Sequence, residues 1–214
     1  MGLRLRLAAA WTPEATLARA LDRVRELTVG GLDTLLAERA PGALERIKGE
    51  EAPHTGPGLG PRRAAMAQAH TARVEALIEA VGRDEALRLG RAAMREVGVR
   101  LGEEARARLG AGGSVDDLVR AARVMYRILG IDFRVERSSP DRAVMRVSRC
   151  ALSDWYTEEA CLVLSAADEG VVRGLNPDMA MAFSSRITCG APECEAEIAI
   201  GAPAGAPVGQ GADP

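Results

Sequence analysis

The four cysteines are the side chains of this sequence best suited to chemistry, and all of them lie in its last third. They are Cys150, Cys161, Cys189 and Cys194. Thiolate is a soft ligand, and four thiolates can hold a tetrahedral zinc ion or a [4Fe–4S] cluster. The last two fall close together in a predicted turn. We therefore expect a metal centre bound by all four cysteines, with an iron–sulfur cluster as the first choice and zinc as the second.

The spacing of the cysteines leaves other interpretations open. Zinc ribbons have two close CxxC pairs and bacterial ferredoxins have a compact cysteine run, whereas only one pair is close here. Cys161 precedes an apolar stretch and could be a buried apolar side chain. Cys189 and Cys194 could instead form a redox-active disulfide.

Few other side chains offer acid–base chemistry. The two histidines, His54 and His70, could act as a base or a ligand, or could be exposed polar residues. Asp168 and Glu169 follow Cys161 in a predicted helix and could serve as acid and base if they face the cysteines. A solvated helix face explains them equally well. The candidate catalytic residues are therefore Asp168, Glu169 and His70.

Two arginines lie near cysteines in the sequence. Arg149 precedes Cys150, and Arg186 comes shortly before Cys189. Either could bind a substrate carboxylate through two hydrogen bonds or lower a thiol pKa, while a solvated surface is the alternative. The glycine-rich stretch 110–113 lacks the Gly-Lys-Ser/Thr of a phosphate loop, so no nucleotide is expected.

Helices must position part of this chemistry, because apolar residues recur at helical spacing throughout residues 1–130. Thr12 is a predicted N-cap, and Ser114 is another. Gly30 and Gly31 predict a break in the first helix. A loop rich in Gly and Pro, containing His54, is expected over 41–61. The predicted helices cover 13–36, 62–81, 84–109 and 114–129.

After residue 130 the pattern changes to period two, which is typical of strands. We expect a first hairpin, then a helix, then a second hairpin whose turn contains Cys189 and Cys194. These elements cover 131–136 with 143–149, then 154–170, then 179–187 with 195–200. The tail 201–214 has the composition of a disordered segment. The predicted fold is α+β: a helical layer over 1–130 that packs on a cysteine-bearing region, 131–200, with an antiparallel sheet of two hairpins.

Residues 123–200 resemble a known family. The resemblance rests on Arg149-Cys150, on Cys161 within a helix, on Gly-Leu-Asn-Pro at 174–177 and on the closing cysteine pair at 188–194. These features are similar to the family named for L-2-amino-thiazoline-4-carboxylic acid hydrolase, and more distantly to 4-vinyl reductase-type binding domains. The resemblance implies an α+β domain and a hydrolysis that opens a five-membered thiazoline ring. It also implies the four cysteines as site positions, with Asn176 as a neighbour.

Composition excludes several classes of protein. The chain has 214 residues, 47% hydrophobic residues and a net charge of −2, values typical of a globular protein without nucleic-acid partners. No apolar run is long enough to span a membrane, and the apolar stretch near the start is too short for a signal peptide. We therefore expect a cytoplasmic protein. Lys48 is the sole lysine among 28 basic residues, which indicates a GC-rich bacterial genome.

These observations together predict a metal- or iron–sulfur-dependent hydrolase or desulfurase. Its substrate would be a small carboxylate containing sulfur and nitrogen, held by Arg149 or Arg186. The alternative is a non-catalytic four-cysteine domain that binds metal, senses a small molecule or dimerises. The long apolar helices could form a homodimer as well as a core.

Overall fold

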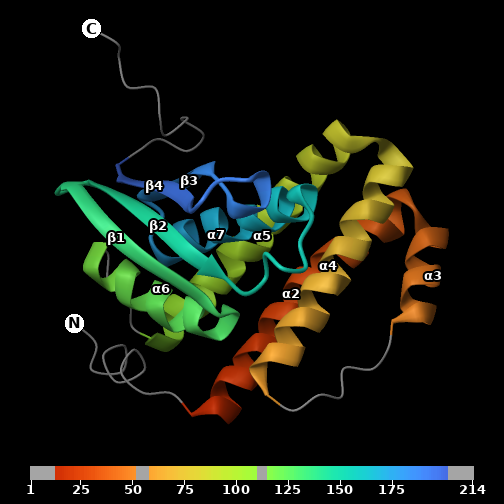
Figure 1. Cartoon of the computed structure of the whole chain (residues 1–214), viewed down its shortest axis with the longest axis horizontal. Helices are drawn as coiled ribbons and strands as arrows, with labels where there is room; N and C mark the ends of the chain where they lie inside the picture. Colours follow the sequence, from red (N-terminus) through yellow and green to blue (C-terminus); the bar gives the residue numbers. More distant parts are fainter. Residues whose placement is uncertain (1–12, 52–57, 110–114, 202–214) are drawn as a thin grey trace, which may run out of the picture.

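The computed structural model describes residues 13–51, 58–109 and 115–201. It has the predicted α+β fold, mostly helical with a four-stranded antiparallel sheet at its C-terminal end (Figure 1). The helices are α2 (Glu14–Arg39), α3 (Pro41–Glu50), α4 (Leu59–Val81), α5 (Arg83–Leu109), α6 (Val115–Leu129) and α7 (Glu158–Leu175). The strands are β1 (Ile131–Ser139), β2 (Arg142–Cys150), β3 (Met179–Ser185) and β4 (Cys194–Ile200), and a short 3-10 turn, η1 (Ile187–Cys189), follows β3.

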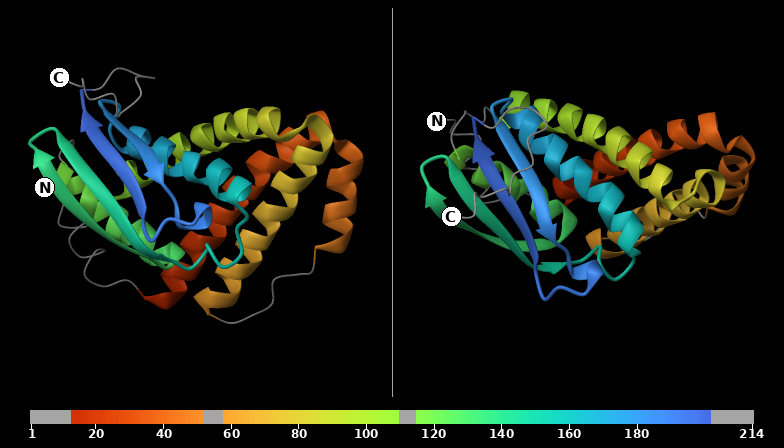
Figure 2. Two further views of the ribbon diagram at one scale, coloured as in Figure 1. Left: turned by 45° about the horizontal axis from the view of Figure 1, so that its top comes forward. Right: turned by 90° about the horizontal axis from the view of Figure 1, so that it is seen from above.

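The two predicted hairpins form one sheet. Its strand order is β1-β2-β4-β3, and the hairpins join where β2 pairs with β4. The inward face carries alternating apolar residues such as Met145, Val147 and Ile198, which share one core with α5, α6 and α7. The other face carries Arg–Glu pairs such as Arg146–Glu195. Figure 2 shows the sheet with its helices on one side only, so the functional residues of the sheet must point toward those helices.

Glycines bring α5 and α7 into close contact. A Cβ atom at Gly170 would overlap the carbonyl oxygen of Arg95 on α5, and one at Gly98 would overlap the carbonyl oxygen of Ala167 on α7. Gly102 and Gly174 lie one turn further along the two helices and are equally close to the opposite backbone. The two helices therefore run parallel at a separation that only glycine permits. This contact fixes the position of α7.

Two predictions about the first half of the chain are wrong. Gly30 and Gly31 do not break α2, which is continuous. A Cβ atom at Gly31 would lie only 2.8 Å from Val97 and 2.9 Å from Met94, so glycine here allows α2 to approach α5. The predicted loop over 41–61 contains α3, because Pro41 sits favourably in the first turn of a helix.

Several predictions lie outside the described residues. They are the Thr12 and Ser114 caps, His54, the glycine stretch 110–113 and the tail after residue 201. Among the residues that are described, no helix is long and apolar enough to cross a membrane.

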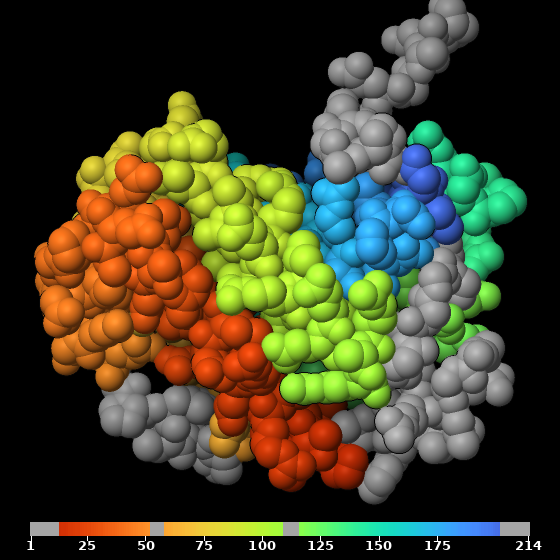
Figure 3. Space-filling model, turned by 180° about the vertical axis from the view of Figure 1, so that it is seen from behind, coloured from red at the N-terminus to blue at the C-terminus, as the bar shows by residue number. Residues whose placement is uncertain are grey.

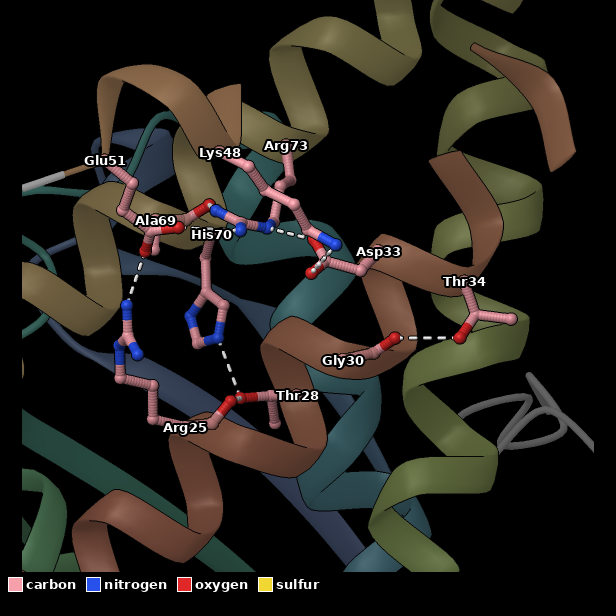
Figure 4. A network of polar contacts seen from close by, with 10 residues as sticks. All are labelled: Arg25, Thr28, Gly30, Asp33, Thr34, Lys48, Glu51, Ala69, His70 and Arg73. Atoms are coloured by element: carbon pink, nitrogen blue, oxygen red, sulfur yellow. Dashed lines mark hydrogen bonds and ion pairs between the residues drawn. The ribbon is translucent and has the colours of Figure 1, made fainter. Parts of the chain in front are cut away.

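A buried ionic cluster joins α2, the end of α3 and α4 (Figure 4). Arg73 is only 1% exposed; its Nε donates to Asp33 and its Nη2 donates to Glu51 over 2.9 Å. Glu51 also pairs with Arg25, and Asp33 lies 3.5 Å from Lys48. A buried charge is tolerated when it is paired in this way. The cluster ties α4, which carries His70, to α2 and the end of α3.

Candidate functional site

A cavity of about 360 Å³ lies between the helices and the inward face of the sheet. Its walls come from α2, α4, α5, α6, α7, the segment after β2 and the ends of β3 and β4, and they are mainly apolar. A few polar side chains point into it, among them His70, Tyr156, Asp168 and Arg186. A largely apolar cavity with a few convergent polar groups is typical of a small-molecule site.

A β-bulge in β2 turns Cys150 toward this cavity. Asp132 pairs with Arg149, whereas the next residue, Phe133, pairs with Val147, so β2 has one extra residue at Ser148. The extra residue shifts the side-chain alternation, which places Cys150 on the inward face. Arg149 consequently points to solvent, where its Nε donates to Asp132 over 2.8 Å. Arg149, a predicted substrate-binding residue, therefore does not line the cavity.

Helix α7 presents one polar stripe to the cavity. It begins later than predicted because the Thr157 hydroxyl accepts a hydrogen bond from the Ala160 amide and caps the helix. Cys161, Ser165 and Asp168 follow at positions i, i+4 and i+7, which lie on one face, and all three line the cavity. Glu169, the other candidate acid or base, lies on a different face.

Glu169 has a structural partner on α5. Its carboxylate lies 3.0 Å from Arg91 and 2.9 Å from Arg95, and it is not among the cavity-lining residues. Asn176 is also outside the cavity. It is the C-cap of α7, and its side-chain oxygen accepts a hydrogen bond from the Asp178 amide. Glu169 therefore stabilises the contact of α7 with α5, and Asn176 ends α7.

The structure brings three of the four cysteines to one cavity. Cys150, Cys161 and Cys194 line it, whereas Cys189 is exposed on η1 and does not. Across the described ranges, no three His, Cys, Asp or Glu side chains are placed to hold a metal ion. The residues present therefore do not fit the four-thiolate zinc or [4Fe–4S] centre that the sequence predicts.

The cavity thiols are held in their neutral form. Burial raises the pKa of Cys150 to about 11, and it also raises the pKa values of Cys161 and Cys194. The hydroxyl of Thr188 lies beside the Cys161 thiol, and the backbone amide of Ile187 donates to the Cys194 sulfur over 3.3 Å. Because the thiolate is the nucleophile, the three cysteines are poor nucleophiles at neutral pH and act as weakly polar walls.

Arg186 is a buried cation without a carboxylate partner. Its Nε and Nη2 donate to the Ser165 hydroxyl oxygen over 3.2 and 3.1 Å, and the guanidinium lies 5.1 Å from the centre of the Phe183 ring. No carboxylate of the described residues forms an ion pair with it, although arginines elsewhere on this chain pair extensively. A buried cation is costly unless an anion compensates it. Arg186 is therefore suited to bind an anion in the cavity.

Asp168 lies in the same cavity and titrates near neutral pH. Burial raises its pKa to about 7; a hydrogen bond from Tyr126 lowers it, the negative charge of Glu169 raises it and the positive charge of Arg186 lowers it. Tyr126 is itself buried, with its ring edge-on to Phe133 at 5.0 Å. A carboxyl group whose pKa is close to the working pH can both accept and donate a proton.

His70 is buried and positions Tyr156. Its Nε2 lies 2.8 Å from the Thr28 hydroxyl, and its Nδ1 lies 2.8 Å from the Tyr156 hydroxyl (Figure 4 shows the Thr28 contact). Burial, with Arg73 and Arg25 nearby, lowers the pKa of His70 to about 3, so the ring is neutral. Thr28 donates its hydrogen to the Val24 carbonyl and must accept from Nε2–H. Tyr156 therefore donates to Nδ1.

The oxygen of Tyr156 acts as a hydrogen-bond acceptor in the cavity. Its own hydrogen is donated to His70, so only the lone pairs of the phenol oxygen remain for a ligand. Tyr156 and Asp168 both face the cavity, and burial raises the pKa of Tyr156 well above its usual value, so it stays protonated. His70 is thus a positioning residue and not a base in this arrangement.

Sequence reasoning missed three cavity residues: Ser165, Tyr126 and Thr188. Ser165 lies on the i, i+4, i+7 stripe of α7 and contacts Arg186, and Tyr126 contacts Asp168 on the same stripe, so this stripe could have identified both. No sequence pattern identifies Thr188. Its hydroxyl oxygen is buried and has no hydrogen bond of normal geometry within the described residues. It is therefore available to a ligand.

The fold and cavity define a class of α+β protein in which helices and a sheet enclose a small-molecule site. The family model described as L-2-amino-thiazoline-4-carboxylic acid hydrolase matches residues 62–198, well over half of the chain. The chain belongs to this family, as its cysteine and Asn-Pro motifs predict. No curated protein matches it.

Two solved structures share the fold. One is a trafficking protein particle complex subunit 3 from Naegleria fowleri covalently bound to palmitic acid, with 15% identity and a TM-score of 0.52 over 64% of this chain and 94% of that one. The other is the phenol-responsive sensory domain of the transcription activator PoxR with phenol, with 16% identity and a TM-score of 0.50 over 64% of this chain and 74% of that one. At these identities the likeness extends to the fold alone.

Proposed function

We propose that the protein is a hydrolase that opens the ring of a small thiazoline-type carboxylate. One observation carries this proposal: a buried arginine without a carboxylate partner shares a cavity with a carboxyl group whose pKa is about 7. The family is named for such a hydrolase, which supports the reaction class. No step of the proposal uses a metal, because the cysteines do not fit such a centre.

Arg186 would bind the substrate carboxylate. Two of its N–H groups are engaged by Ser165, and those that remain can donate to two carboxylate oxygens. The pKa of Asp168 is about 7, so its carboxylate form is populated at neutral pH, and this is the form that accepts a proton.

Asp168 would move the proton during ring opening. A water molecule adds to C2 of the ring while the Asp168 carboxylate accepts one of its protons. The C2–S bond then breaks, and Asp168 returns this proton to the departing sulfur. The oxygen of the water stays on C2 as a carbonyl oxygen, and its second proton ends on the ring nitrogen. General acid–base transfer of this kind contributes about 10²–10⁴-fold.

Tyr156 would orient the attacking water. Its oxygen is an acceptor held by His70, so it can accept a hydrogen bond from one O–H of that water. Arg186 then fixes the ring and Tyr156 the water, which sets the direction of attack on C2.

Steady-state kinetics of Arg186→Met tests the proposal. We expect kcat/KM for L-2-amino-thiazoline-4-carboxylate to fall by about 100-fold, since a lost hydrogen-bonded charge costs up to ~3 kcal/mol. Arg149→Met is the matched control, because Arg149 points to solvent, and it should retain the wild-type value. Equal losses in both variants, or none in Arg186→Met, would contradict the role of Arg186.

A sensing domain is the second candidate. It is favoured by the apolar walls and by the fold shared with a phenol-responsive sensory domain. Such a protein would bind an apolar small molecule without turnover. Calorimetric binding of a thiazoline carboxylate with no ring-opened product over hours would favour this alternative.

A further inference from the structure

The cavity is long and apolar compared with an unsubstituted thiazoline ring. Helix α7 lines it from Cys161 to Val171, a distance of ~15 Å at the rise of an α-helix. Ser165, which holds Arg186, lies near the first end of this stretch. From Ser165 to Val171 the helix rises by ~9 Å. A ring bound at Arg186 therefore leaves the Val171 end of the cavity unfilled.

The Val171 end of the cavity is more apolar than the end at Arg186. Val171 contacts Gly102 on α5, which brings the last turns of α5 to this part of the cavity. The walls here are mainly apolar: Val24, Leu101, Ala105 and Met125 line the cavity between α2, the last turns of α5 and α6.

The same end faces solvent. Arg23 and Glu104 line the cavity and form an ion pair of 2.9 Å between α2 and α5. Arg108, one turn beyond Glu104, also lines it and has 72% of its side chain exposed. Figure 3 shows this face, where the start of α2 lies beside the last turns of α5. This end of the cavity thus opens to solvent beside charged residues, and Arg186 lies toward the other end.

Resting on the proposed function, we propose that the preferred substrate is a thiazoline-4-carboxylate with an apolar substituent of roughly six carbons at C2. This length matches ~9 Å of wall, which runs from Asp168 to Val171 on α7 and then from Gly102, opposite Val171, to Ala105 on α5. In a five-membered ring, substituents at C4 and C2 point away from each other. A carboxylate on Arg186 at one end therefore directs the C2 substituent toward Val171 and Ala105. Asp168, between Ser165 and Val171 on α7, lies beside the ring carbon that must react.

The chemistry remains the hydrolysis described above. Water adds to C2, the C2–S bond breaks, and the oxygen stays on C2, so the product is an N-acyl amino acid with a free thiol. One proton of the water ends on sulfur and the other on nitrogen. No oxidant, reductant or further reactant is required.

The test compares three substrates on the full-length protein, with product quantified by chromatography and mass spectrometry. They are the 2-amino, 2-methyl and 2-hexyl thiazoline-4-carboxylates. We expect kcat/KM for the 2-hexyl compound to exceed that for the 2-methyl compound by at least about tenfold, since each methylene in an apolar pocket adds to discrimination. A 2-hexyl value equal to or below the 2-methyl value would overturn this inference.

Variants locate the effect in the cavity. Ala105→Leu fills the Val171 end and should lower the hexyl-to-methyl ratio of kcat/KM by at least about tenfold. Ala107→Leu, the same change at an exposed position two residues away, should keep the wild-type ratio. Should Ala105→Leu fail to fold, Val24→Phe makes the same test from α2. An unchanged ratio in a folded Ala105→Leu or Val24→Phe variant would overturn the assignment.

The two proposals fail in different ways. Opening of the 2-amino compound without any preference for the hexyl compound would overturn the inference on substrate length and leave the hydrolase intact. Opening of none of the three compounds would overturn the proposed function and this inference with it.

Discussion

Replacing Asp168 by asparagine should stabilise the protein, and more so as pH rises. Burial raises the pKa of Asp168 from 3.8 to about 7, so in the folded state the group stays protonated over a range where the unfolded chain has lost the proton. The wild type therefore loses stability as pH rises from about 4 to about 7, and the penalty is constant above that. The substituted side chain has nothing to ionise, and its amide oxygen can still accept from Tyr126.

The magnitude follows from the two pKa values. About three pKa units at 1.36 kcal/mol each give a ceiling of ~4 kcal/mol at pH 8. Asp168 borders the cavity and is only partly buried, which weakens the effect of burial, so we expect a gain of about 2–4 kcal/mol at pH 8 that vanishes near pH 4. Urea denaturation between pH 4 and pH 8.5 measures it. Asp178→Asn, at an exposed position, is the control and should show no such growth.

One result would refute this reasoning. A difference between Asp168→Asn and wild type that does not change with pH would mean that Asp168 has an ordinary pKa. A variant less stable than wild type at pH 8 would mean that the carboxylate is the stabilised form, as in an ion pair. Either result would remove the acid–base role proposed for this residue.

Three further predictions concern the scaffold and the cysteines. Gly170→Ala should lower the free energy of unfolding by about 2–3 kcal/mol because its Cβ overlaps the backbone of α5. Gly30→Ala is the control: this position has open space around it, so the change should be neutral or slightly stabilising. Equal effects of the two changes in a melting experiment would contradict the close contact. Arg73→Met should cost about 1.5–3 kcal/mol in urea titration because it removes the buried cation and its hydrogen bonds and leaves Asp33 and Glu51 with only Lys48 and Arg25. A loss below about 0.5 kcal/mol would show the cluster to be dispensable. At pH 7.5 the exposed Cys189 should react with a thiol reagent at once, whereas Cys150, whose pKa burial raises to about 11, should react slowly. Mass spectrometry of the labelled protein measures both rates. Protection of Cys189 would instead favour a bound metal.

The architecture could largely be predicted from the sequence. Period-two alternation after residue 130 located both hairpins, and the apolar spacing located α4, α5 and α6. The failures involve glycine and proline. Gly31 follows the usual rule for a helix break, yet its role is to let α5 approach, which depends on a partner far away in the sequence. Pro41 starts a helix for which the sequence favoured a loop.

The site was only partly predictable. Cys150, Cys161 and Cys194 do meet, and Arg186, Asp168 and His70 surround the same cavity. Cys189 and Arg149 do not line the cavity. Cys189 lies on an exposed turn, and the β-bulge directs Arg149 to solvent. A bulge is set by the partner strand as much as by the bulged one, so spacing within β2 could not reveal it.

The central claim is that Arg186 and Asp168 open a thiazoline ring in this cavity. Its most direct test is the rate of ring-opened thiol formed from L-2-amino-thiazoline-4-carboxylate by the wild type and by Asp168→Asn at pH 7. The account predicts steady turnover by the wild type and a kcat at least about 100-fold lower in the variant. Absence of product from the folded wild type, or equal rates for the two proteins, would contradict it.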